Sequence, residues 1–221
     1  QPGLKAMENK MNKKLINILA ISFVAVFITQ VGHEATHGIL ATLVGAKWTQ
    51  FNLFFVDHKW LGESSRTGDL IITGGAAIMN ILVGFLAAYF FNQKAFAYRA
   101  TLRLFLFYLA AYNTFTGFGY LFTDPLFYQK GGENLGDWKK IVDMLGGGWN
   151  VRLPIALIGA AGTLWMFMWI GRNAQAFITD QTQRMKTCVQ LMLVPYLVWN
   201  LVIVALGSFL PFPEISVIIA I

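Results

Sequence analysis

The chemistry of this chain is concentrated in one short motif. His33, Glu34 and His37 form the pattern H-E-x-x-H. Four residues are about one turn of an α-helix, so the two imidazoles project from one face and can bind the same metal ion. Glu34 follows the first histidine, where its carboxylate can reach a water molecule at the metal and accept a proton from it. The motif therefore predicts a metal-dependent hydrolase.

Two histidines do not complete a catalytic metal site, which needs a third protein ligand and an open coordination position. Two imidazoles, one carboxylate and a water favour zinc, while iron, cobalt and manganese are alternatives on ligand chemistry alone. Asp137 follows Gly136 at the start of an expected short helix, where it could cap that helix or serve as a rigidly held ligand. The other candidates for the third ligand are Asp124, His58 and Glu133.

Composition identifies the environment in which this chemistry takes place. Of 221 residues, 56% are hydrophobic and only 13% are charged, where a soluble domain has about 25% charged residues. This balance excludes a disordered chain and a nucleic-acid-binding module, and the single cysteine, Cys188, excludes an intrachain disulfide. The net charge of +6 comes from clusters between apolar runs, as in the flanks of membrane spans. We therefore expect a lipid bilayer as the surroundings and no nucleic-acid partner.

The apolar runs predict an all-α multi-pass membrane protein. About five runs are long enough to cross a bilayer, which takes about 20 helical residues: 15–45, 70–91, 100–122, 153–170 and 188–209. A short helix is expected over 137–145, and the apolar tail 215–221 is too short to span and should lie at the interface or on the bundle. The connection 47–69 is rich in aromatics and partly alternating, which predicts a short strand or hairpin near the membrane surface.

The first span contains the metal motif, which places ionisable side chains at membrane depth. Such a residue costs about 2.5–3.5 kcal/mol and indicates a functional site. Asn80 and Asn113 lie inside the second and third spans. Each amide could donate to a developing oxyanion, or could form an interhelical hydrogen bond of about 0.6 kcal/mol. Small residues at 74–77 and 159–162 allow helices to approach closely, and could also pair two copies as a homodimer.

Together, these motifs carry a family resemblance. The H-E-x-x-H near the end of the first span, the stretch from Gly75 to Asn80 in the second and the later Asp-led helix resemble the site-2 protease family of intramembrane metalloproteases, in particular its compact bacterial and archaeal branch. In that family the third motif is Asn-Pro…Asp-Gly, and its Asp is the third zinc ligand. Here Gly136-Asp137-Trp138 stands in place of Asp-Gly, and Asn113 could hold the place of the upstream Asn. The resemblance covers about residues 15–145 and ranks Asp137 ahead of Asp124.

The resemblance implies a division of the chain and an activity. A polar and basic segment, residues 1–14, would precede a single membrane-embedded metalloprotease domain over 15–221, with core motifs in 15–145 and accessory helices in 151–221. The implied activity is a zinc-dependent endopeptidase, with one zinc per chain and Glu34 as general base. It would cleave membrane-spanning proteins in a prokaryotic cell membrane.

Two other activities are compatible with the same residues. A membrane hydrolase of a lipid or small amide could use the same metal chemistry, and a non-enzymatic transporter could use the His and Asp residues as an ion path. A peptide substrate must unwind from its helix to expose a carbonyl, and the aromatic connection could offer a strand edge for an extended segment.

Overall fold

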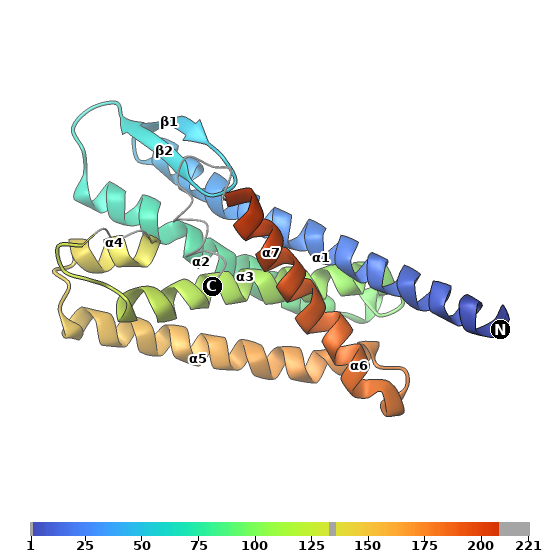
Figure 1. Cartoon of the computed structure of the whole chain (residues 1–221). Helices are drawn as coiled ribbons and strands as arrows, with labels where there is room; N and C mark the ends of the chain where they lie inside the picture. The colour runs from blue at the N-terminus through green and yellow to red at the C-terminus, as the bar shows by residue number, and fades with distance from the viewer. Residues whose placement is uncertain (1, 133–135, 208–221) are drawn as a thin grey trace.

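The structure is a computed structural model that describes residues 2–132 and 136–207, with side chains from Lys13 onward. Its helical and hairpin elements are drawn in Figure 1. The helices are α1 (Pro2–Leu43), α2 (Arg66–Phe91), α3 (Ala100–Leu126), α4 (Asp137–Met144), α5 (Trp149–Asn173), α6 (Arg184–Cys188) and α7 (Val194–Gly207). The strands are β1 (Ala46–Phe51) and β2 (Val56–Trp60). Short helical turns lie at Lys94–Phe96, Ala174–Phe177 and Gln181–Gln183, and a π-helical turn, Val189–Leu193, joins α6 to α7.

Four of the described helical segments are long and apolar enough to cross a membrane: Lys13–Leu43, Arg66–Phe91, Trp149–Phe177 and Gln181–Leu206. They coincide with the first, second, fourth and fifth predicted spans and indicate a membrane protein. The third predicted span forms α3, a helix of 27 residues that is not among these four. Five spans therefore stay a prediction. The tail 215–221 lies outside the described residues, and residues 2–14 continue α1 as helix.

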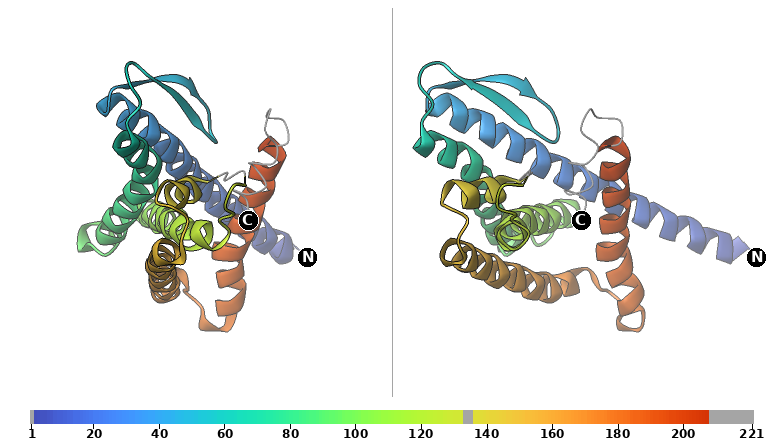
Figure 2. Two further views of the ribbon diagram at one scale, coloured as in Figure 1. Left: turned by 90° about the vertical axis from the view of Figure 1, so that its left-hand side faces the viewer. Right: turned by 60° about the vertical axis from the view of Figure 1, so that its left-hand side comes forward.

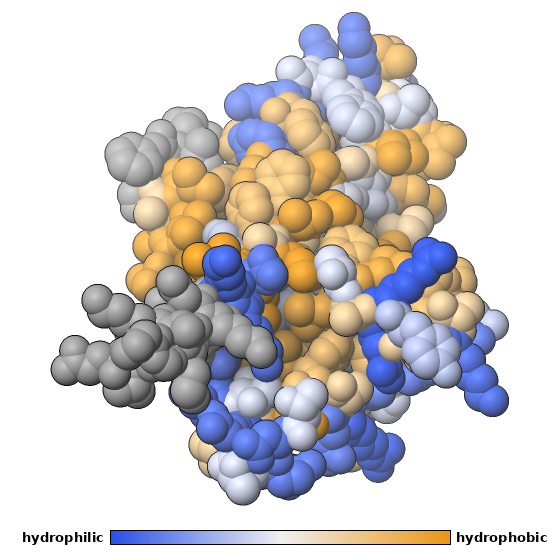
Figure 3. Space-filling view, turned by 90° about the vertical axis from the view of Figure 1, so that its right-hand side faces the viewer, coloured by the Kyte–Doolittle hydropathy of each residue, from blue (hydrophilic) through white to orange (hydrophobic). Residues whose placement is uncertain are grey.

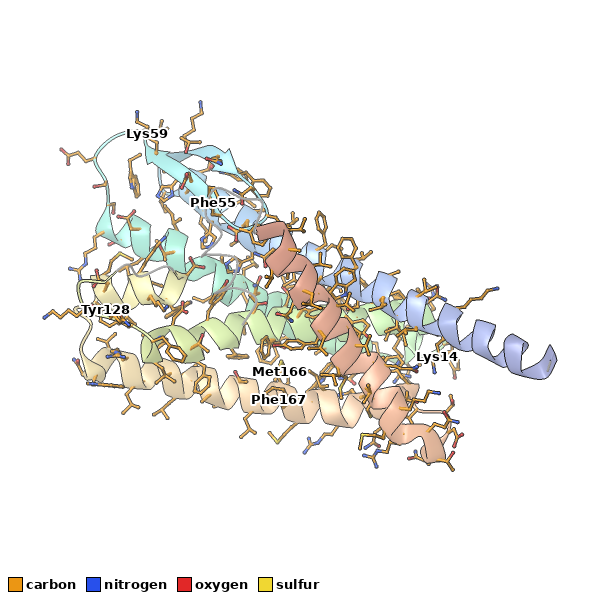
Figure 4. The ribbon with its side chains drawn as sticks, viewed as in Figure 1. Lys14, Phe55, Lys59, Tyr128, Met166 and Phe167 are labelled. Atoms are coloured by element: carbon orange, nitrogen blue, oxygen red, sulfur yellow. The ribbon has the colours of Figure 1, made fainter. Side chains whose placement is uncertain are left out.

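Helix α3 lies inside the bundle, in contact with α1, α2, α4 and α5. Glycines allow α3 to approach the backbones of α2 and α5 closely. A Cβ at Gly117 would lie 2.7 Å from the Ala77 carbonyl of α2, and one at Gly159 of α5 would lie 2.3 Å from the backbone of Phe122. The small residues of α5 therefore serve helix packing. On the same helix Met166 is 1% exposed and Phe167 is 58% exposed, so α5 has an inner and an outer face (Figure 4).

Helix α7 crosses α1 on the side of the bundle away from α2, as the two views of Figure 2 show. Hydrogen bonds between polar side chains stabilise the crossing of α7 and α1. The Trp199 indole donates to Ser22 Oγ at 3.0 Å, and Ser22 Oγ lies 2.6 Å from the Tyr112 hydroxyl. Ser22 is fully buried, and this contact ties together α1, α3 and α7.

The predicted hairpin is confirmed. Strands β1 and β2 pair antiparallel, with an irregularity between Trp48 and Gln50. The hairpin covers the ends of α1 and α2 nearest the metal motif (Figure 1). Two indoles anchor it: a Cβ at Gly38 of α1 would lie 2.3 Å from the Trp48 ring, and one at Gly68 of α2 would lie 2.3 Å from the Trp60 ring. The absent side chains thus allow the hairpin to pack on both helices.

Candidate metal centre

The three predicted ligands converge on one point. His33 and His37 are buried on α1, and each Nε2 lies 3.1 Å from Oδ2 of Asp137 on α4. The two Nε2 atoms lie 3.3 Å from each other. Among the described residues, this trio is the group of His, Cys, Asp and Glu side chains whose ligand atoms lie close enough together to hold a metal ion.

The separations fit a tetrahedral zinc site. Ligand atoms at the usual zinc distance of about 2.0–2.1 Å and at tetrahedral angles lie about 3.3 Å from one another. The three observed separations are 3.1, 3.1 and 3.3 Å. The two Nε2 atoms and Asp137 Oδ2 all point their lone pairs at the same small region. Lone pairs repel one another, so this region must hold positive charge, either as protons on the imidazoles or as a bound cation. The donor set, two imidazoles and one carboxylate, is that of a catalytic zinc site.

The hydrogen bond on the far side of His37 fixes its tautomer. His37 Nδ1 donates to the carbonyl oxygen of Ile72 on α2 at 2.7 Å. A carbonyl can only accept, so the Nδ1 carries a hydrogen and, in the neutral ring, the Nε2 keeps its lone pair. This is the arrangement of a metal-binding histidine. The approach of α2 to α1 that makes it possible depends on Gly75, where a Cβ would lie 2.1 Å from Leu40.

The Nδ1 atom of His33 also has a hydrogen-bonding partner, which here is a side chain. The Asn80 amide nitrogen, buried on α2, lies 3.0 Å from His33 Nδ1. After a half-turn of the amide, its oxygen can accept the Nδ1 hydrogen, which leaves Nε2 free to bind a metal. The structure therefore places Asn80 behind a predicted ligand rather than on the open side of the site.

Asp137 reaches the histidines because α4 is held at its start. Gly136 has φ +155°, and a Cβ there would lie 2.9 Å from Asp124 Oδ2. Asp124 Oδ2 accepts from the backbone nitrogen of Trp138 at 3.0 Å, so Asp124 caps α4 from α3. Burial raises the pKa of the Asp137 carboxyl, but the charge of His37 and the hydrogen bonds from both histidines outweigh this and lower the pKa well below its usual range. Asp137 therefore stays ionised.

Two further contacts press α4 against α2. The Arg66 guanidinium of α2 donates to the Met144 carbonyl at the end of α4. Ile141 packs over Gly74, where a Cβ would lie 2.6 Å from the Ile141 side chain. In α2, Gly74 thus faces α4, and the next residue, Gly75, faces α1.

The remaining candidates for the third ligand have other roles or places. Asp124 caps α4, as described, and is not part of the converging trio. His58 lies on β2, where its Nε2 is 4.0 Å from the Asp69 carboxylate. Glu133 lies outside the described residues. The alternative assignment of the third ligand to Asp124 therefore has no geometric support, because its carboxylate is occupied by the backbone of α4.

Asn113 is not at the site. Its amide nitrogen donates to Thr29 Oγ1 at 2.7 Å and to the Leu109 carbonyl at 2.9 Å. This is the interhelical hydrogen bond that the sequence allowed as an alternative. Asn113 lies 11 residues before Asp124 on α3, about 16 Å along the helix axis, which accounts for its distance from the cavity.

A cavity of about 570 Å³ opens beside the trio. Glu34 lies in its wall, 4% exposed, and accepts a hydrogen bond from Gln30 at 3.3 Å. The hairpin contributes Phe54, Phe55 and Val56 to the lining. Figure 4 marks Phe55 at the hairpin. The cavity wall therefore combines the Glu34 carboxylate and the three predicted ligands with apolar side chains of the hairpin.

Tyr120 and Lys140 are among the cavity residues that the sequence analysis missed. The Tyr120 ring lies 5.4 Å from the His33 ring, centroid to centroid, and Lys140 lies in the wall with Glu34. Helical spacing could have found both, because Tyr120 is four residues before Asp124 and Lys140 three after Asp137. Neither belongs to a recognisable motif, so no sequence pattern marks them as functional.

Comparison with known proteins adds no relative. No protein-family model, no curated protein and no solved structure matches the chain. The function is therefore inferred from the residues of the cavity and from the motifs of the sequence.

Proposed function

We propose that this protein is a zinc-dependent intramembrane endopeptidase of the site-2 protease type, in a prokaryotic cell membrane. The observation that carries the proposal is the convergence of His33 Nε2, His37 Nε2 and Asp137 Oδ2 within 3.1–3.3 Å, beside the buried carboxylate of Glu34. His33, His37 and Asp137 would hold the zinc ion, one per chain. Bound there, zinc would supply Lewis-acid chemistry: it polarises a carbonyl and makes water acidic near neutral pH.

Glu34 is the proposed proton carrier. Its carboxylate would accept the proton from the attacking water and return it to the amine that leaves when the peptide C–N bond breaks. Gln30 holds this carboxylate from the preceding helical turn. Asn80 would orient His33 rather than bind the oxyanion. Of the cavity residues with a hydroxyl, Thr73, Tyr120 and Thr123, Tyr120 lies beside the His33 ring and could donate a hydrogen bond to the oxyanion.

The proposed substrate is a membrane-spanning protein segment that has unwound locally. A helical peptide bond keeps its carbonyl within the helix, so it must be drawn out before it can be attacked. The hairpin borders the cavity and its two strands pair only with each other in the described part of the chain. A free strand edge could hold an extended segment by backbone hydrogen bonds.

Metal content of the detergent-purified protein is the first test. We expect about one zinc per chain in the wild type, and loss of zinc in both His37→Ala and Asp137→Ala. Asp124→Asn is the matched control, since it removes the charge of a nearby carboxylate but keeps a side-chain oxygen that can accept from the Trp138 backbone nitrogen and cap α4, and it should still bind zinc. Wild-type protein without metal after zinc is added back would contradict the proposal.

Glu34→Gln separates hydrolysis from ion binding. This variant should keep its zinc and lose cleavage of reconstituted transmembrane substrates, because the amide cannot carry the proton. If the protein is instead a hydrolase of a lipid or a small amide, Glu34→Gln should abolish hydrolysis of that lipid or amide. A transporter would show ion flux in liposomes and no cleavage by either protein.

A further inference from the structure

A second cavity lies at the opposite end of the molecule from the metal centre. It is a groove of about 640 Å³ between α1 and the start of α3. Ala20, Ile21 and Val24 form the α1 wall, and Leu102 and Phe105 form much of the α3 wall. These side chains are apolar, and Val24 is 47% exposed, so the groove is open along the surface of the first predicted span.

One cationic side chain lines this groove. Arg99, the residue before α3, is part of the lining and is exposed. No salt bridge joins it to a carboxylate within residues 13–132 and 136–207. An apolar channel with one unpaired guanidinium matches, in outline, an acyl chain attached to a phosphate group.

The whole end of the molecule around this groove is basic. Segments 13–27, 91–108 and 169–191 contain eight Lys and Arg residues and a single acid, Asp180. They share one hydrophobic cluster that includes Ile18, Phe107 and Leu191. Acids gather instead near the metal centre, where Asp57, Asp69, Asp124 and Asp143 lie with the ligand Asp137. Figure 3 views the basic end and shows an apolar area bordered by hydrophilic residues.

We propose that the groove between α1 and α3 binds one anionic phospholipid of the surrounding bilayer. An acyl chain would lie along Ala20, Val24 and Phe105, and the phosphate would pair with Arg99. Two observations favour a lipid over a soluble anion: the groove is apolar along its length, and it opens on a surface of apolar residues. The basic segments around it favour an anionic headgroup over a zwitterionic one.

Native mass spectrometry of the detergent-purified full chain can test this site. Phosphatidylglycerol and phosphatidylcholine of the same acyl chains would be titrated in parallel. We expect one saturable phosphatidylglycerol per chain, held more tightly than phosphatidylcholine. Arg99→Ala should weaken phosphatidylglycerol binding about fivefold, as expected for the loss of one basic residue near a lipid phosphate. It should weaken phosphatidylcholine binding less, because the choline cation of that lipid already offsets the charge of its phosphate.

Two further variants separate the groove from general electrostatics. Ala20→Phe keeps every charge and fills the groove, so it should weaken the binding of both lipids. Arg172→Ala removes an exposed cation from the same end without touching the groove, and should bind as the wild type does. Equal affinity for the two lipids, or equal losses in Arg99→Ala and Arg172→Ala, would overturn the proposal. Helical circular dichroism and monodisperse gel filtration confirm the folding of each variant.

Discussion

At the scale of single residues, the candidate metal centre depends on what lies behind its ligands. Both histidines come from α1, and the far nitrogen of each ring meets α2: a backbone carbonyl for His37 and the Asn80 amide for His33. A hydrogen bond at the far nitrogen fixes which nitrogen faces the metal and how the ring is turned. The carbonyl partner of His37 cannot be removed by substitution, whereas the partner of His33 can.

Asn80→Ala should therefore weaken zinc binding without abolishing it. Loss of such a partner costs about 10–100-fold in metal affinity, and we expect a loss in this range in a competition titration against a chelating dye. Asn80→Asp should recover most of the affinity, because a carboxylate accepts the Nδ1 hydrogen of His33 more strongly than an amide does.

Asn113→Ala is the matched control for this measurement. It also removes a buried intramembrane amide, but one that bonds Thr29 and Leu109 away from the site. Its zinc affinity should equal that of the wild type. Similar losses in the Asn80 and Asn113 variants would show that the effect comes from general loosening of the helices.

At the scale of elements, the third ligand depends on where α4 begins. Asp137 is the first residue of this helix, and the preceding Gly136 has a backbone conformation that side chains rarely adopt. The same glycine leaves room for the Asp124 carboxylate, which caps α4 from α3. A side chain at residue 136 would disturb both the backbone and the cap.

Gly136→Ala should therefore reduce zinc affinity by displacing Asp137. Gly131→Ala is the control: Gly131 also has positive φ, at +73°, but a Cβ there would meet nothing within 4 Å. Both variants carry a conformational cost of about 1–3 kcal/mol, and only the first should change zinc binding in the dye titration. Wild-type affinity in Gly136→Ala would show that α4 does not need this close approach.

The sequence predicted the elements better than it predicted their contacts. The long apolar runs and the aromatic connection indicated the helices and the hairpin, because these depend on local pattern. The histidine pair followed from helical spacing alone. Asp137 could not be separated from Asp124 on local grounds, since the distinction depends on α3 capping α4 across 14 residues. The roles of Asn80 and Asn113 could not be distinguished from the sequence for the same reason. Both are amides inside apolar helices, and they differ only in the residues that they contact in the folded protein.

At the scale of the whole molecule, the proposed ligands join two parts of the chain that are 100 residues or more apart. His33 and His37 lie on α1, and Asp137 lies on the short helix α4 after the third predicted span. A metal ion bound by all three would act as a cross-link between these helices. Because the unfolded chain does not hold the three side chains together, zinc should bind the folded state preferentially and stabilise it.

Zinc should accordingly raise the thermal midpoint of the detergent-solubilised protein, and a chelator should lower it. At a free zinc concentration 100 times the dissociation constant, the stabilisation is about 2.7 kcal/mol, or roughly 5–10 °C for a chain of this size. His37→Ala should melt at one temperature with or without zinc. Hydrogen exchange would locate the effect: zinc should slow exchange in α4, which depends on the ligand Asp137, far more than in α5, which contributes no ligand. Equal protection of both helices would point to a non-specific effect of the metal rather than a cross-link between α1 and α4.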